Sequence, residues 1–262
     1  PASSREAAGL PAPAWKPSQA GFASRKDCVR ARGMRREWAP PRQLAKFERL
    51  NIYNLLARHL GRRVDLELLV LHVPKTGGTA LKGALRERYG DSLAIGYLRQ
   101  QDGIAGKRAL IGHFTAKSVA RVRAARRLTV LREPLDRAIS EYFHFKTAPA
   151  PGNPHGDRVK AGQGFVDFLA HPDICRAYTG HYFARANMAH WLVIDHERLR
   201  RDWREVMSQL ELPPRPRQAM QRAAAFSGYE EARARLLADA CAMAQARDLF
   251  RADTAFYARW AA

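Results

Sequence analysis

Two stretches of the chain join a short apolar run to residues at helical spacing. The first run, Leu68 to Val73, is short and aliphatic, as a buried strand is, and the turn PKTGGT follows it. Apolar residues from Leu81 onward then recur at helical spacing, and Gly90 is a typical helix end. The second run, Leu128 to Leu131, leads into a helix with a proline in its first turn. Each stretch predicts a strand, a loop and a helix.

Further apolar runs predict the rest of a sheet. The apolar run 109–114 and residues 191–195 indicate buried strands, and we expect a helix from about residue 197 to 210 after the second. A proline-rich break at 213–216 precedes two amphipathic helices, expected at about 229–246 and 247–260. Because strands alternate with helices, we expect residues 40–262 to form a single α/β domain around one core.

Two segments show little periodicity. Residues 1–39 are rich in Pro, Ala, Ser and Arg, which predicts a mobile basic arm, and a helix from about residue 42 to 60 is expected to join it to the first strand. The stretch 147–164 holds several prolines and glycines between helices. It is long enough to be a lid over an acceptor site or a disordered loop, and the sequence favours neither.

The PKTGGT turn has the composition of an anion-binding loop. Gly77 and Gly78 lack a Cβ, so the backbone can adopt positive φ and approach an anion while the first N–H groups of the next helix point toward it. Lys75 adds a full charge, and Thr76 and Thr79 add hydroxyl donors. The lysine precedes the glycines, so the loop differs from the G-x-x-x-x-G-K-[ST] pattern of nucleotide triphosphatases. On composition alone, an ordinary strand-to-helix turn with a chance lysine stays an alternative.

Both stretches also resemble parts of a known family. The segment HVPKTGGTAL resembles the 5'-phosphosulfate-binding loop of sulfotransferases that use 3'-phosphoadenosine 5'-phosphosulfate (PAPS), in particular the carbohydrate branch with heparan sulfate 2-O-sulfotransferases and bacterial relatives. The segment LTVLREPLDRAISEY is similar to that family's 3'-phosphate-binding segment, in which an arginine at the strand end and a serine on the helix hold the 3'-phosphate. The resemblance implies a P-loop-type three-layer fold with a central parallel sheet flanked by helices, plus C-terminal helices. It implies nucleotide contacts from Lys75, Thr76, Gly77, Gly78, Thr79, Ala80, Arg132 and Ser140.

The spacing of the second segment sets a condition on this assignment. Ser140 stands eight positions after Arg132, so it lies about two turns along the helix, roughly 10 Å up its axis. One phosphate can touch both only if the arginine side chain reaches along the helix, which its length permits. The alternative for Arg132 is an ion pair with Glu133, Asp136 or Glu141.

A histidine at the end of a predicted strand is the candidate general base. The resemblance to carbohydrate sulfotransferases with a Gly-His pair at a similar place implies this role for His113. Imidazole suits the task because its ordinary pKa lies near neutrality. A structural role is the alternative for His113. His144 and Glu141 are further candidates, although a solvated helix face is expected for Glu141, and His72 is expected to pack or to brace the loop.

The resemblance implies in-line transfer of a sulfuryl group from PAPS to an acceptor hydroxyl. Lys75 would stabilise the leaving bridging oxygen, the loop N–H groups would bind the 5'-phosphate, and His113 would take the acceptor proton. No metal is implied. The expected partners are the nucleotide sulfate donor and a glycan or glycolipid acceptor. The resemblance leaves open whether this acceptor is acidic.

Two other classes of protein compete with a sulfotransferase. A P-loop kinase or nucleotide hydrolase would need a Walker-type lysine and a magnesium carboxylate after a later strand, where this chain has Arg132. A non-catalytic polyanion- or nucleic-acid-binding protein would explain the positive charge. Aromatic residues interleaved with basic ones are sparse, however, and no nucleic-acid motif occurs, so nucleic acid is not expected as a partner.

Composition indicates that the partner is negatively charged. The formal net charge of +20 favours an anion such as a doubly phosphorylated nucleotide, an acidic glycan or lipid headgroups. The arginine-dense stretches 121–127 and 198–204 are expected to be solvated helix faces, although either could line the path of an acidic acceptor.

Cysteines and hydropathy bear on the compartment. Cys28, Cys175 and Cys241 lie far apart, and no His or Cys spacing predicts a metal site. Three unpaired cysteines favour a reducing cytoplasm. No run of about 18 apolar residues predicts a membrane span. We therefore expect either a soluble, bacterial-type cytoplasmic enzyme or a chain trimmed of a membrane anchor, with peripheral membrane contact left open.

Overall fold

The computed structural model describes residues 65–97, 100–101, 106–120, 122–147, 153–214 and 229–261. The arm predicted at 1–39 and the helix predicted at about 42–60 lie outside the described residues. Within the described part, no helix is long and apolar enough to cross a membrane.

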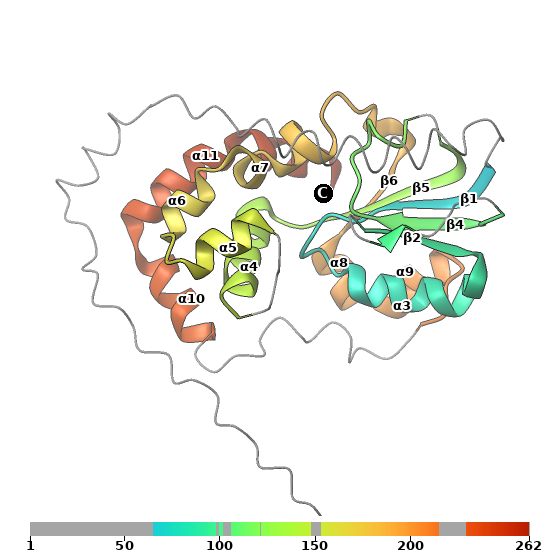
Figure 1. The fold of residues 1–262 in the computed structure, drawn as a ribbon, viewed down its shortest axis with the longest axis horizontal. Coiled ribbons are helices and arrows are strands. Elements are labelled where there is room, and N and C mark those ends of the chain that lie inside the picture. The colour runs from blue at the N-terminus through green and yellow to red at the C-terminus, as the bar shows by residue number, and fades with distance from the viewer. Residues whose placement is uncertain are drawn as a thin grey trace, which may run out of the picture. The chain divides into compact units, whose positions relative to one another are not determined.

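The described residues contain a six-stranded sheet with the strand order β3-β2-β4-β1-β5-β6 (Figure 1). All strands except β3 run parallel, and β3 pairs antiparallel with β2. The predicted parallel sheet is confirmed. Its strands are β1 (Asp65–Leu71), β2 (Leu93–Tyr97), β3 (Gln100–Gln101), β4 (Ala109–Gly112), β5 (Arg123–Leu131) and β6 (Leu192–Asp195).

Helices cover one face of the sheet. Figure 1 shows α3, α8 and α9 on the same side of the strands. Their apolar side chains, such as Leu85, Leu199 and Met207, join strand residues such as Val70 and Ile111 in one buried cluster. The elements on this face are α3 (Gly78–Tyr89), the short 3-10 turn η1 (Gly90–Ser92), α8 (His196–Arg201) and α9 (Trp203–Gln209).

The opposite face is covered by irregular segments and by the end of the last helix. Leu69 and Leu71 of β1 pack there with Phe183 and Trp191, and Phe256 packs against the same cluster. The elements on this face are the π-helical turn η2 (Ala177–Tyr182), the 3-10 turn η3 (Met188–His190) and the C-terminal part of α11 (Ala240–Trp260). The sheet is therefore the middle of three layers, as expected.

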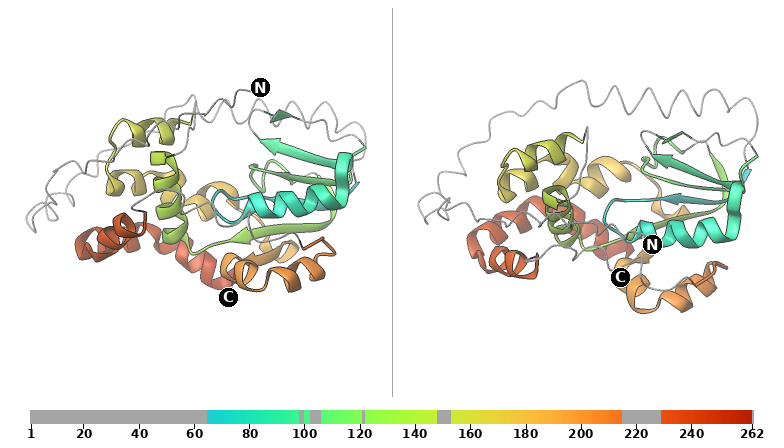
Figure 2. Two further views of the ribbon diagram at one scale, coloured as in Figure 1. Left: turned by 90° about the horizontal axis from the view of Figure 1, so that it is seen from below. Right: turned by 60° about the horizontal axis from the view of Figure 1, so that its bottom comes forward.

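A group of helices continues from the carboxyl end of β5, beside the sheet (Figure 1). Phe143, Phe168 and Phe250 lie in its buried core. Figure 2 shows α11 running from this group to the start of α8, where Tyr257 bonds to Asp195. The group consists of α4 (Pro134–Thr147), α5 (Pro154–Lys160), α6 (Phe165–Leu169), α7 (Pro172–Cys175), α10 (Tyr229–Ala238) and α11.

Several predicted boundaries were wrong for local reasons. The helix expected at about 197–210 is two helices, because the backbone leaves helical geometry at Asp202 (φ −110°, ψ 33°). The last two helices meet at Asp239 rather than near residue 246, since its side chain accepts the N–H of Ala242 and begins α11 there. The stretch 147–164 contains α5, which Asn153 caps by accepting two N–H groups. Residues 123–127 form the start of β5 and not a helix face.

The expectation of unpaired cysteines was also wrong in part. Cys175 is buried and free, but Cys241 is disulfide-bonded. The inference of a reducing compartment from cysteine usage therefore loses its basis.

Candidate anion-binding and catalytic site

The candidate residues gather where the parallel strands end. In the strand order, β4 and β2 lie on one side of β1, and β5 lies on its other side. The chain runs from β1 through α3 to β2 and returns to β5 later. Such a reversal of strand order opens a crevice at the carboxyl ends of the strands, where α/β proteins bind ligands. Lys75, His113 and Arg132 follow the three neighbouring strands β1, β4 and β5 at this edge.

The loop after β1 has two residues in left-handed backbone geometry. Gly77 has a φ of 83°, as the glycine argument predicted, and Lys75 has a φ of 67°. Because Lys75 carries a Cβ, this conformation costs it about 1–2 kcal/mol. Residues held in such geometry cluster at functional sites. The hydroxyl of Thr76 is buried and donates to the carbonyl of Val73 at 2.8 Å, so it braces the loop instead of offering a donor to an anion.

The start of α3 offers backbone N–H groups without a side-chain cap. Gly77 is the N-cap and has no side chain to bond them. Its carbonyl accepts the N–H groups of Ala80 and Leu81, at 3.1 and 3.3 Å, so the amide predicted at Ala80 already has a partner. The amides of Gly78 and Thr79 precede this first bonded turn, where the helix dipole favours an anion.

His72 packs against the same helix start, as the sequence predicted. A Cβ on Gly78 would lie 1.8 Å from Nε2 of His72, so only glycine fits there. The rings of His72 and His113 stack, with centroids 4.3 Å apart and planes at 29°. His72 therefore joins the PKTGGT loop to the candidate base.

His113 is held as a neutral imidazole with a defined tautomer. Its Nδ1 lies 2.7 Å from the carbonyl oxygen of His72, which can only accept, so Nδ1 carries the proton and Nε2 has the lone pair. Burial lowers the pKa of His113, and Lys82 adds to this effect. The His72 carbonyl and the Glu141 carboxylate oppose it. The structure thus presents an uncharged proton acceptor at the end of β4.

Lys75 is partly buried at the same edge. Burial lowers the pKa of its ammonium, and Arg132 lowers it further, whereas the carboxylate of Glu141 raises it. A lysine in this setting has lost part of its hydration, and an incoming anion would replace the missing water.

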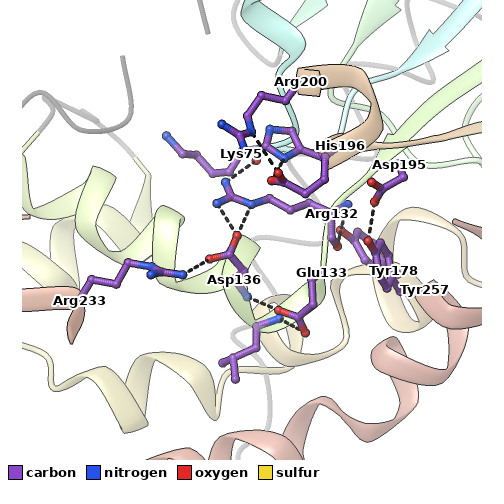
Figure 3. Close-up of polar contacts among 12 residues, drawn as sticks. Lys75, Arg132, Glu133, Asp136, Tyr178, Asp195, His196, Arg200, Arg233 and Tyr257 are labelled. Atoms are coloured by element: carbon purple, nitrogen blue, oxygen red, sulfur yellow. Dashed lines mark hydrogen bonds and ion pairs between the residues drawn. The ribbon is translucent and has the colours of Figure 1, made fainter. Parts of the chain in front are cut away.

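Arg132 joins the second segment to the PKTGGT loop (Figure 3). Its Nη1 donates to the carbonyl of Lys75 at 3.2 Å, and its Nε donates to Asp136 at 2.7 Å. Tyr178 bonds the backbone N–H and carbonyl of Arg132. The ion pair with Asp136, one of the alternatives from sequence, is present. In the described part of the chain the contacts of Arg132 do not include Ser140, which is buried on α4.

Asp136 is shared between two arginines. Arg233 of α10 contacts its other oxygen at 3.0 Å (Figure 3). Burial would raise the pKa of Asp136, but Arg132 and Arg233 hold it below its usual range. The carboxylate of Asp136 therefore holds the side chain of Arg132 in place.

Two further residues of α4 differ in their surroundings. Glu141 is buried and pairs with Arg137 at 2.6 Å, so the solvated helix face expected for it was wrong. His144 is exposed one turn beyond Ser140. Loss of hydration lowers the pKa of His144, and the charge of Lys75 adds to this effect, so His144 lies within electrostatic range of the loop.

Sequence reasoning missed residues that tertiary contacts bring to the site. Tyr178 is far from Arg132 in sequence, and no local pattern indicated their contact. His196 starts α8 and is buried. Burial lowers the pKa of His196, and the charge of Arg132 lowers it further. Its place directly after a predicted strand was the signal that could have found it.

One cluster in the described residues has the side chains of a metal site. Ligand-type atoms of His155, His171 and Asp173 lie within 4.8 Å of one another. However, Nδ1 of His155 accepts from Arg158, and Nδ1 of His171 accepts from the N–H of Asp173. A histidine that ligates a metal through one nitrogen donates through the other, so both bonds would have to break before a metal could bind.

Comparison with known proteins gives one kind of match. No family model matches the chain, and no curated protein matches it. Solved structures that match include mouse sulfotransferase SULT7A1 complexed with PAP. That protein is 17% identical, with a TM-score of 0.36, and the match covers 65% of this chain and 67% of that chain.

Proposed function

We propose that this chain transfers a sulfuryl group from PAPS to a hydroxyl of a carbohydrate or glycolipid acceptor. One observation carries the proposal: the uncapped start of α3, Lys75 and Arg132 lie together at the carboxyl edge of the sheet, and the neutral His113 follows the neighbouring strand. Cationic and N–H groups suit the phosphates of the donor, and a neutral imidazole suits a hydroxyl nucleophile.

Each group has a role in the transfer. The amides of Gly78 and Thr79 would bind the 5'-phosphate, and Arg132 with Ser140 would hold the 3'-phosphate. The acceptor oxygen attacks sulfur while the bond from sulfur to the bridging phosphate oxygen breaks. Lys75 stabilises the negative charge that develops on this oxygen, and Nε2 of His113 takes the hydroxyl proton. Sulfated acceptor and 3'-phosphoadenosine 5'-phosphate are the products.

The contacts of Arg132 support this assignment over a metal-dependent kinase. A kinase of P-loop type uses a carboxylate after a later strand to hold magnesium. Here the end of β5 carries an arginine, and the nearby carboxylate of Asp136 is engaged by two arginines. The carbohydrate or glycolipid nature of the acceptor rests on the resemblance of the HVPKTGGTAL segment and of the Gly112-His113 pair to carbohydrate sulfotransferases.

Calorimetric titration tests the donor site. We expect 3'-phosphoadenosine 5'-phosphate to bind without metal, and Lys75→Ala to weaken binding by about 10- to 100-fold, because a hydrogen bond to a charged group contributes about 1.5–3 kcal/mol. Lys117→Ala, at an exposed lysine, is the matched control and should bind as wild type. Binding of ATP with magnesium only, or of neither nucleotide, would overturn the proposal.

A further inference from the structure

The helix that follows β5 begins with its first amides already bonded. Pro134 has no N–H, and the two oxygens of Glu133 accept the N–H groups of Leu135 and Asp136 at 3.2 and 2.6 Å. The next amide, that of Arg137, donates to the carbonyl of Glu133 at 2.9 Å. A carboxylate thus occupies the kind of helix start that is left uncapped in α3. Positive charge for an anion at the end of β5 therefore has to come from side chains.

Arg132 by itself would not supply that charge. Its Nε and Nη2 contact Oδ2 of Asp136 at 2.7 and 2.5 Å, and the two side chains are 15% and 26% exposed. A guanidinium paired with one carboxylate has no net charge, so an incoming anion would compete with Asp136 for Arg132. The pairing orients Arg132 but weakens it as an anion ligand.

Arg233 of α10 adds a second positive charge to this pair. It lies 97 positions from Asp136 in the sequence, and its Nη2 contacts the other oxygen of Asp136 at 3.0 Å (Figure 3). The side chain of Arg233 is 34% exposed, so it stays within reach of a ligand from solvent. We call these three residues the Arg132–Asp136–Arg233 cluster. Two positive charges share one negative charge in it, so its formal charge is +1.

Stability gives a weak account of the second arginine. An ion pair with this degree of exposure contributes little to folding, and two like charges held on one carboxylate repel each other. An anion bound beside the cluster would offset that repulsion. The cluster also adjoins the PKTGGT loop, because Nη1 of Arg132 donates to the carbonyl of Lys75 at 3.2 Å. Its excess charge therefore lies where the proposed function needs an anion-binding group.

We propose that Arg233 is a specificity-determining residue of the nucleotide site. It keeps the Arg132–Asp136–Arg233 cluster cationic, so that Arg132 is oriented by Asp136 and still binds a phosphate monoester. The inference rests on the proposed function, in which this group is the 3'-phosphate of the donor. A phosphate monoester has a charge of about −1.5 to −2 at pH 7. The cluster therefore selects a nucleotide with a 3'-phosphate over one with a 3'-hydroxyl.

Calorimetric titration with two nucleotides tests this role. We expect Arg233→Gln to bind 3'-phosphoadenosine 5'-phosphate about 10- to 100-fold more weakly than wild type does, because one unit charge near the 3'-phosphate is lost. Adenosine 5'-phosphate, which has a 3'-hydroxyl, should bind both proteins equally. A general defect in folding or in the site would weaken both nucleotides together, and that result would overturn the inference.

Arg235 supplies the matched control on the same helix. It pairs with Glu231 instead of Asp136, and its side chain is 54% exposed. Arg235→Gln removes one positive charge from α10, as Arg233→Gln does, but it should bind 3'-phosphoadenosine 5'-phosphate as wild type does. Equal weakening by the two variants would show an effect of overall charge alone and would contradict the selective role of Arg233.

A double variant separates the charge of the cluster from its contacts. Asp136→Asn in the Arg233→Gln background returns the formal charge to +1 and leaves an amide oxygen to accept from Arg132. We expect this double variant to bind 3'-phosphoadenosine 5'-phosphate more tightly than Arg233→Gln alone. A purely structural role for the contacts predicts a further loss of affinity, and such a loss would count against the inference.

The wild-type titration distinguishes failure of the inference from failure of the proposed function. If wild type binds 3'-phosphoadenosine 5'-phosphate and Arg233→Gln binds it equally well, the inference is wrong and the proposed donor site stands. If wild type does not bind this nucleotide, the proposed function is wrong, and the inference falls with it.

Discussion

His113 carries its proton on Nδ1 because its partner there is the carbonyl oxygen of His72. The same neighbour stacks on the ring and packs against Gly78 at the start of α3. His72 therefore fixes the orientation and tautomer of His113, and it also packs against the backbone of the PKTGGT loop. The reactivity of His113 depends on these contacts as much as on the residue type.

Replacement of His113 tests its role as base. We expect His113→Ala to lower kcat by about 100- to 10,000-fold, the range for loss of a general base. Binding of 3'-phosphoadenosine 5'-phosphate should change little, because the ring is assigned no contact with the nucleotide. Steady-state kinetics and calorimetry measure the two effects. His190→Ala, at an exposed histidine, should behave as wild type in both, and full turnover in His113→Ala would move the base to another group such as His144.

Several helices begin where one side chain accepts hydrogen bonds from the first amides of the helix. Asn153 begins α5, Asp195 begins α8 and Asp239 begins α11 in this way. His171 does the same for α7, with Nδ1 accepting the N–H of Asp173. A cap of this kind requires a neutral ring, because a protonated imidazole has no lone pair to accept with.

The cap at His171 predicts acid sensitivity. Burial, and then the neighbouring His155, lowers the pKa of His171 from 6.5 to about 4. Between these values the unfolded chain binds a proton that the folded chain does not, so the free energy of unfolding falls as the pH falls. The full effect is up to about 3 kcal/mol, and it is absent above the unfolded pKa.

Replacement of this histidine by asparagine keeps a capping side chain and removes the titration. We expect the loss of unfolding free energy between pH 7 and pH 5, measured by urea denaturation, to be smaller in His171→Asn than in wild type. His190→Asn, at an exposed position, should lose as much as wild type. Parallel losses in all three proteins would contradict the prediction.

At the scale of the whole molecule, α11 connects the helical group to the candidate site. Asp253 of this helix is buried and accepts hydrogen bonds from the N–H groups of Tyr178 and Thr179, at 2.7 and 2.9 Å. Tyr178 in turn bonds both backbone groups of Arg132. A residue near the end of the sequence thus positions the arginine assigned to the nucleotide.

Loss of this carboxylate should act on stability and binding together. Asp253→Ala leaves buried donors without their charged acceptor, so we expect it to lower the free energy of unfolding by at least about 3 kcal/mol. Where the variant is folded, it should also bind 3'-phosphoadenosine 5'-phosphate more weakly, since Arg132 loses its support. Urea denaturation and calorimetry measure these effects.

The same helix supplies the control. Asp248 pairs with Arg251 at an exposed surface, and Asp248→Ala should change stability by about 0.5 kcal/mol or less. If Asp253→Ala were no more destabilising than Asp248→Ala, the support of Arg132 through Tyr178 would be wrong.

The sequence by itself determined the elements that depend on neighbours in the chain. The strand, glycine turn and helix around Lys75 and the proline-led helix after Arg132 are encoded by apolar periodicity and by residues with special backbone preferences. Because parallel strands end at one edge of a sheet, these signals also predicted which loops meet. The expectation of an anion-binding loop followed from the residues of the PKTGGT turn, whereas the role expected for His113 came from the resemblance to carbohydrate sulfotransferases.

Only the tertiary structure decided the state of the charged groups. Asp136 was one of several candidate partners for Arg132, the burial of Glu141 was not expected, and the contact of Tyr178 with Arg132 had no local signal. Helix breaks at Asp202 and Asp239 were missed as well. The physical reason is that burial, electrostatic range and hydrogen-bond partners are set by residues far apart in sequence, whereas periodicity reports only on a few turns of the chain.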